Sequence, residues 1–249
     1  MTSTRGIGWA EESWNPTSGC TKISPGCDHC WAERMAWRLR GMGQKRYARG
    51  FEVTTHDDLL DKPLHWAKPR LVYVSFMGDL LHDEVPDEFI QRVFDAMVRS
   101  PQHRFHVLTK RPERLASMSP RLPWPANAWA GATVEDAAHA YRADQLRQTG
   151  AATKYLVLEP LLGQIDELDL KGIDWVILGG ESGPGARPPH IEWVRSVRDQ
   201  CVAADVPFYF KQWGGLRRKE TGRTLDGRLW DERPQESHQL GFEKIEAVV

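Results

Sequence analysis

Short runs of consecutive apolar residues alternate along this chain with longer segments in which apolar residues recur every three or four positions. The first pattern predicts buried strands, and the second predicts amphipathic helices. We predict strands at 70–76, 103–108, 127–134, 154–158, 173–178 and 207–210, with a weaker first strand within 6–18. We predict helices at 30–39, 86–98, 112–115, around 141–146 and at 191–204.

Strands that alternate with helices, and that are apolar almost throughout, are typical of a parallel sheet covered by helices. Polar residues recur just past the strand ends: the cysteines near position 20, Asp79, Lys110, Glu135, Glu159, Glu181 and Lys211. In a barrel these ends share one mouth, where such folds carry their chemistry. We therefore predict an α/β fold, an incomplete (β/α) barrel of six to seven parallel strands related to the TIM barrel. The alternative is an open doubly wound sheet, which gathers ligands at a switch point.

The predicted barrel occupies residues 1–213, and residues 214–249 form a C-terminal hairpin and tail. The hairpin is basic, and Asp226-Gly227 marks its turn. We expect it either to cover the mouth and touch an anionic substrate or to be a surface hairpin without a ligand.

The overall charge gives no global attraction to nucleic acid or to an anionic membrane. Lys and Arg number 33 against 34 Asp and Glu, a net charge of −1. Residues 45–51 combine basic and aromatic side chains, as in a segment that contacts phosphates, and the alternative is a solvated surface loop. No apolar run approaches the roughly 20 residues of a membrane span, and no signal-peptide core is present. We expect a cytoplasmic protein that does not bind membranes, with reduced thiols.

Three of the four cysteines, Cys20, Cys27 and Cys30, lie within eleven residues on a loop that contains glycine and proline. Three thiolates can hold three irons of a [4Fe-4S] cluster and leave the fourth iron open for a small molecule. A disulfide would leave one thiol unpaired. Structural zinc would require His29 or the distant Cys201 as a fourth ligand, and would suggest a non-catalytic interaction module. Unrelated buried cysteines are expected at apolar positions instead.

A cysteine triplet after the first strand of a β/α-repeating chain resembles the radical S-adenosylmethionine (SAM) superfamily. That superfamily usually has Cys-x3-Cys-x2-Cys, whereas this chain has Cys-x6-Cys-x2-Cys and keeps only the second gap. The chain also resembles an uncharacterised phage-associated family that is described by its three-cysteine motif and is encoded beside a three-Cys-motif partner protein. The matching segments are 14–20, 24–27, 108–112, 158–163, 179–188 and 210–214.

The resemblance implies a radical-SAM-like barrel in which Cys20, Cys27 and Cys30 ligate a [4Fe-4S] cluster. SAM would chelate the open iron, and its reductive cleavage would give a 5′-deoxyadenosyl radical that abstracts hydrogen from the substrate. Since the amine-binding motif of the superfamily follows the second strand, Met77, Gly78 and Asp79 are expected to bind the methionine group. The remaining residues of the expected cofactor site are Thr133, Glu135, Gly179, Gly180 and Glu181.

Lys110, Glu159 and Lys211 are the candidate catalytic residues, as groups that bind substrate or a carboxylate. An alternative is that these side chains form a buried ion-pair network that braces the mouth. The expected partners are a nucleic-acid or nucleotide substrate, the three-Cys-motif partner protein, and a reductase or flavodoxin as electron donor. A further alternative is a nucleotide-binding glycine loop at 179–185, although it lacks the Gly-Lys-Ser/Thr ending of a P-loop.

Overall fold

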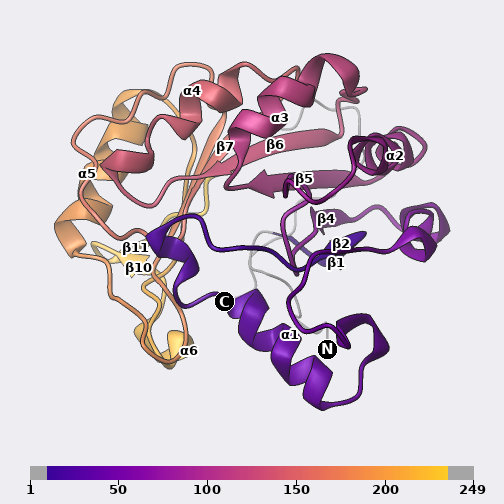
Figure 1. Cartoon of the computed structure of the whole chain (residues 1–249). Coiled ribbons are helices and arrows are strands. Elements are labelled where there is room, and N and C mark those ends of the chain that lie inside the picture. Colours follow the sequence, from indigo (N-terminus) through magenta and orange to yellow (C-terminus); the bar gives the residue numbers. More distant parts are fainter. Residues whose placement is uncertain (1–9, 235–249) are drawn as a thin grey trace.

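Seven parallel strands form the central sheet of the computed structural model, which describes residues 10–234. Their spatial order follows the chain, so each strand pairs with the one before it, and the sheet curls into a half-barrel with β1 and β9 at its two edges (Figure 1). The strands are β1 (Glu12–Trp14), β4 (Leu71–Val74), β5 (Arg104–Thr109), β6 (Ala128–Thr133), β7 (Lys154–Leu158), β8 (Trp175–Gly179) and β9 (Phe208–Gln212). The predicted partial barrel is confirmed, and the doubly wound alternative is wrong because the strand order never reverses.

Four helices lie along the outer side of the sheet (Figure 1). They are α2 (Asp87–Val98), α3 (Pro112–Met118), α4 (Arg142–Arg147) and α5 (Ile191–Ala203). Successive strand residues point to opposite faces. The outward-facing strand residues pack with these helices into one core: Val72, Val74, Phe105, Val107, Ala128, Ala130, Ala132, Leu156, Leu158, Val176, Leu178, Phe208 and Phe210. The inner face is lined by a second cluster that is rich in aromatic side chains, including Trp129, Tyr155, Trp175 and Tyr209.

Helix α1 (Trp31–Gly41) begins directly after Cys30 and lies apart from the four outer helices (Figure 1). Its start and that of α2 agree with the prediction to within one residue. Proline precedes α2, and the negative charges of Asp87 and Glu88 in its first turn interact favourably with the positive end of the helix dipole.

Several elements are too short to produce a periodic pattern, and the sequence did not predict them. Strands β2 (Thr17–Ser18) and β3 (Thr54–Thr55) pair antiparallel. The 3-10 turns are η1 (Pro25–Cys27), η2 (Lys45–Tyr47), η3 (Asp57–Leu59), η4 (Lys62–His65), η5 (Ser119–Arg121) and η6 (Ala137–His139).

The predicted C-terminal hairpin is present as β10 (Thr224–Leu225) and β11 (Arg228–Leu229), preceded by α6 (Arg218–Thr221). Asp226 and Gly227 have φ angles of 52° and 77°, as the predicted two-residue turn requires. Trp230 anchors this segment to the β9 edge: its carbonyl accepts a hydrogen bond from Phe210 N at 2.9 Å, and its ring packs against Phe208. Residues 235–249 of the predicted tail and residues 6–9 of the predicted first strand lie outside the described residues. None of the helices within 10–234 combines the length and the apolar character needed to cross a bilayer.

Candidate functional site

The cysteine loop, defined here as residues 20–30, lies across the carboxyl ends of the sheet strands. The residue just before the loop, Gly19, contacts the segment that follows β4. Gly19 forms a parallel bridge with Gly78, and Gly19 N donates to Met77 O at 2.9 Å. A Cβ on Gly78 would lie 2.6 Å from Gly19 O, so only glycine allows the two backbones to approach this closely.

Arg111, two residues past β5, connects the loop to the sheet. Its guanidinium donates to Cys20 Sγ at 3.3 Å, to Asp79 Oδ2 at 3.2 Å and to Thr21 O at 3.2 Å. The buried Asp79 also accepts from Thr109 Oγ1 at 2.8 Å and from the Leu81 amide at 2.9 Å. Both oxygens of Asp79 are therefore used by protein donors, and they position Arg111, which in turn contacts Cys20.

Glu135, just past β6, holds the middle of the loop. The side chain is fully buried. It accepts from Ser24 Oγ at 2.5 Å, from Lys110 Nζ, and from Arg142 Nη1 at 2.9 Å. Burial opposes its ionisation, but the charge and hydrogen bond of Lys110, together with Ser24 and Arg142, lower the pKa of Glu135 below its usual value. The Glu135 carboxylate is thus a buried anion at neutral pH, compensated from three directions.

The end of the loop is held by Glu181, which follows β8. His29 Nδ1 lies 3.0 Å from Glu181 Oε2, and Arg187 Nη2 lies 2.6 Å from Oε1. Arg187 also donates to Pro25 O at 2.8 Å, so the same guanidinium reaches the loop backbone. Burial raises the pKa of Glu181, but the hydrogen bonds from Arg187 and His29 outweigh it and bring the pKa to about 2. Arg34 of α1 donates to Ser182 O at 3.1 Å and adds a second link to this segment.

Glu159 and Lys211, at the ends of β7 and β9, form an ion pair with Nζ–O distances of 2.6 and 2.7 Å. They lie at the mouth together with Asp79 and the cysteine loop, because Glu159, Asp79 and Cys30 all lie near Tyr73. The burial of the Tyr73 side chain and the nearby charges of Asp79, Glu159 and Cys30 all raise the pKa of Tyr73. The predicted candidates are therefore brought to the carboxyl end of the sheet. Glu159 and Lys211 form an ion pair of the kind that the alternative interpretation anticipated, whereas Lys110 pairs with Glu135, which was predicted as a cofactor residue.

The predicted glycines at the end of β8, Gly179 and Gly180, are explained by packing within the protein. A Cβ on Gly180 would lie 1.9 Å from Trp213 O, and a Cβ on Gly179 would lie 3.2 Å from Glu159 Cδ. Thr133 contributes its carbonyl to Arg142 at 2.8 Å. Binding of SAM by the predicted cofactor residues stays a prediction.

The thiols of the loop are free and partly buried, so no disulfide joins them. Cys201 is buried in the core on α5 and is not available as a fourth ligand for zinc. Burial and the Asp79 charge raise the pKa of Cys20 to about 12 against the opposing Arg111 charge, and burial raises that of Cys30. Thiols must lose their protons to ligate a metal.

Within residues 10–234, no group of three or more Cys, His, Asp or Glu side chains is already gathered around one point as metal ligands. The chemistry of the donor set nevertheless fits an iron–sulfur cluster. Three thiols lie on one loop at the mouth, and a guanidinium N–H donates to the Cys20 sulfur.

Sequence reasoning did not assign several residues that build this site: Ser24, Arg111 and Arg142. The position of Arg111 could have identified it, because it follows Lys110 just past a predicted strand, where the other candidate site residues also lie. Nothing in the sequence pattern marked Arg142 as a site residue, since an arginine on an amphipathic helix is ordinarily exposed. Ser24 is one of several small polar residues in its loop.

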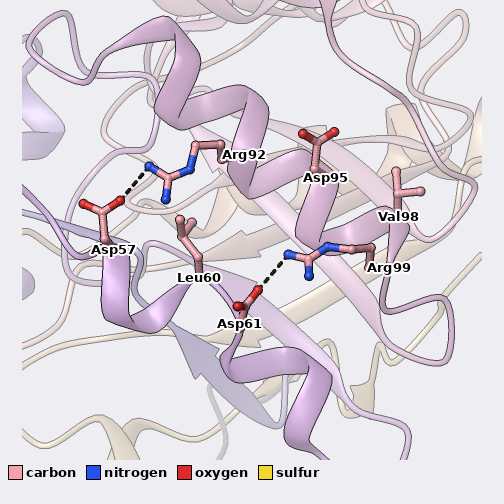
Figure 2. A pocket seen from close by; sticks show the side chains of 7 residues that line it. All are labelled: Asp57, Leu60, Asp61, Arg92, Asp95, Val98 and Arg99. Carbon is pink, nitrogen blue, oxygen red and sulfur yellow. Dashed lines mark hydrogen bonds and ion pairs between the residues drawn. The ribbon is translucent and has the colours of Figure 1, made fainter.

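A second region, the outer cavity, lies between η3 and α2 and has a volume of about 590 Å³ (Figure 2). It is lined by Asp57, Leu60, Asp61, Arg92, Asp95, Val98 and Arg99. Two ion pairs cross it, Arg92–Asp57 at 2.6 Å and Arg99–Asp61 at 2.7 Å, and all four side chains are more than half exposed. It contains none of the predicted site residues.

The fold and the site define a class of protein: a half-barrel of parallel strands with a three-cysteine loop held across its mouth. Residues 4–234 match the model of a family described as "Protein of unknown function (DUF5131)", so the chain belongs to this family. No curated protein matches the chain, and no solved structure matches it.

Proposed function

We propose that this protein is a radical SAM enzyme whose three-cysteine loop holds a [4Fe-4S] cluster at the mouth of the half-barrel. The observation that carries the proposal is the attachment of the cysteine loop to the sheet. Side chains past β5, β6 and β8 bind the loop through Arg111, Glu135 and Glu181. In barrel folds this edge is where catalytic chemistry occurs.

In the proposed enzyme, Cys20, Cys27 and Cys30 hold the cluster. When bound, a cluster with an open iron supplies the electron that cleaves SAM to a radical able to remove hydrogen from a substrate. Arg111 donates to the Cys20 sulfur and offsets negative charge there. The backbone of Met77 and Gly78 adjoins the start of the loop and is the proposed contact for the methionine group of SAM.

The remaining side chains orient groups and exclude water. Lys211 forms an ion pair with Glu159 and holds it in position at the mouth, and Lys110 holds Glu135 in the same way. The aromatic inner face, which includes Tyr155 and Trp175, fills the half-barrel below them and keeps bulk water from the reacting groups. The proposed substrate is related to nucleic acid, and a reductase or flavodoxin is the proposed electron source.

The test is to purify the protein without oxygen, measure iron and sulfide, and assay 5′-deoxyadenosine after addition of SAM and dithionite. We expect about four irons and four sulfides per chain, as a [4Fe-4S] cluster requires. The triple variant C20A/C27A/C30A should lose both the iron and the product, whereas C201A should keep both because Cys201 lies in the core. Stoichiometric zinc without sulfide would overturn the proposal and favour a zinc-stabilised interaction module.

A further inference from the structure

Helix α1 presents two exposed tryptophans beside the cysteine loop. Trp31 is 44% exposed and Trp37 is 49% exposed, which is unusual for so large an apolar side chain. The opposite side of the helix, with the fully buried Ala36, packs against the protein. Within α1, Ala36 is fully buried and Met35 and Leu39 are partly buried, whereas both tryptophans expose nearly half of their surface.

Both rings are held in place by packing. Trp31 packs on Phe76 with ring centroids 4.9 Å apart. The Trp37 ring covers Gly50, where a Cβ would lie 2.7 Å from the ring, and the Arg40 guanidinium lies 5.1 Å from the Trp37 ring centre. Aromatic rings that are fixed before a ligand arrives bind it at a lower entropic cost.

The same surface is strongly basic in a chain of net charge −1. Between positions 31 and 52 the acidic residues are Glu33 and Glu52. The basic residues there are Arg34, Arg38, Arg40, Lys45, Arg46 and Arg49. Arg46 and Arg49 pair with Asp58 and Glu52, but Arg38, Arg40 and Lys45 form no ion pair within residues 10–234, and Arg40 lies over the Trp37 ring. Arg38 and Arg40 are thus exposed on the same helix as the two tryptophans, and the exposed Lys45 begins η2, which packs against α1.

We infer that this α1 surface, consisting of Trp31, Trp37, Arg38, Arg40 and Lys45, binds a single-stranded nucleic acid. Bases stack on the two tryptophans, and phosphates contact the three cations, as in proteins that bind single strands without strong sequence preference. Because Trp31 follows Cys30 directly, a base stacked on Trp31 lies beside the cysteine loop. The identification of this strand as the substrate rests on the proposed function, whereas the binding itself does not.

The arrangement favours nucleic acid over an anionic membrane. A helix that lies in a membrane interface needs a continuous apolar face turned outward. In α1, Ala36 is the residue buried against the protein, and the exposed positions mix Trp31 and Trp37 with Arg38 and Arg40, so they form no continuous apolar face. Only unpaired bases offer free faces to the two rings, which favours a single strand over a duplex.

The test is fluorescence anisotropy of a fluorescein-labelled 20-residue oligothymidylate titrated with the full chain at several salt concentrations. We expect W31A/W37A to bind at least tenfold more weakly, because loss of one base–aromatic stack commonly costs about tenfold. R38E/R40E should bind more weakly and show a shallower salt dependence, by about 0.7 in the log–log slope for each lost phosphate contact. W31Y/W37Y should restore most of the affinity, and circular dichroism confirms that each variant is folded.

The matched control is K68E/K171E, which makes the same change in net charge at two exposed lysines away from α1 and should bind within about twofold of the parent. Equal binding by W31A/W37A and the parent, or no oligothymidylate binding at low salt, would overturn the inference. So would sedimentation with phosphatidylglycerol vesicles in the absence of oligothymidylate binding.

The two proposals fail separately. Formation of 5′-deoxyadenosine by a protein that does not bind the oligonucleotide would leave the enzyme proposal intact and overturn this one. Tryptophan-dependent oligonucleotide binding by a protein that holds no iron would support the α1 surface and overturn the enzyme proposal.

Discussion

The mouth of the half-barrel and the outer cavity both gather charged side chains, but they hold them differently. At the mouth, the fully buried Glu135 meets partners from the cysteine loop, from the segment after β5 and from α4. In the outer cavity, Arg92–Asp57 and Arg99–Asp61 join neighbouring elements and remain more than half exposed (Figure 2).

The difference shows that cavity volume alone does not identify a functional site. Exposed ion pairs gain little, because water already solvates both partners. A buried carboxylate is strongly disfavoured unless several donors compensate it. Where the fold keeps buried charges, the positions of the side chains around them are therefore narrowly fixed. These fixed side chains lie at the mouth, around the cysteine loop.

The largest effect that we predict comes from Glu135→Ala. The substitution leaves Arg142 buried without its carboxylate and removes the partner of Ser24 and Lys110. We expect the free energy of unfolding to fall by about 3–5 kcal/mol, as when one partner of a buried ion pair is removed. Urea unfolding measures this. A loss below 1 kcal/mol would mean that the mouth tolerates charge changes like an exposed surface.

Gly26→Ala should have the next largest effect. The new Cβ would lie 2.4 Å from Glu135 Oε1, and that oxygen cannot move away freely because Ser24 and Lys110 hold it. We expect a loss of about 1–3 kcal/mol, as for other overpacked sites, and a lower iron content.

The control for Gly26→Ala is Gly41→Ala. Gly41 ends α1, and a Cβ there meets nothing within 4 Å. This change should be neutral or stabilise by up to about 1 kcal/mol. Equal behaviour of the two variants in urea unfolding and in iron content would argue against close contact between the loop and Glu135.

At the outer cavity, the double variant R92Q/R99Q removes both ion pairs. Each exposed pair is worth about 0.2–1 kcal/mol, and less at high salt. We expect a decrease in the free energy of unfolding within that range per pair, and no change in iron content. A cost comparable to that of Glu135→Ala would abolish the contrast between the two regions.

The smallest effect concerns the pH dependence of an exposed carboxylate. Hydrogen bonds from Arg195 and Arg198 lower the pKa of Asp226 from 3.8 to about 2. The folded pKa is below the unfolded one, so the stabilisation is present above about pH 4 and is lost as the pH falls toward 2. Asp226→Asn should therefore lower the melting temperature slightly at pH 7, with a smaller difference at pH 3. A difference that grows on acidification would contradict this assignment.

The elements with long apolar runs were predictable from the sequence. Strand β7 has the predicted bounds, Lys154–Leu158, and helix α2 begins one residue later than predicted. The strands of a βαβ chain with short connections pair with their neighbours, so the strand order could also be predicted from the sequence. Elements such as β2 and β3 were missed because two residues show no periodicity.

By itself, the sequence determined the repeating strand–helix pattern, the cysteine triplet and the set of polar residues that follow the strands. Only the tertiary structure decided which of these side chains meet. Glu135 and Ser24 lie 111 positions apart, and Arg111 and Cys20 lie 91 apart. Apolar periodicity is a local property that each segment carries alone. The pairing of buried charges depends on which loops the closed sheet brings together, and on how little water remains between them.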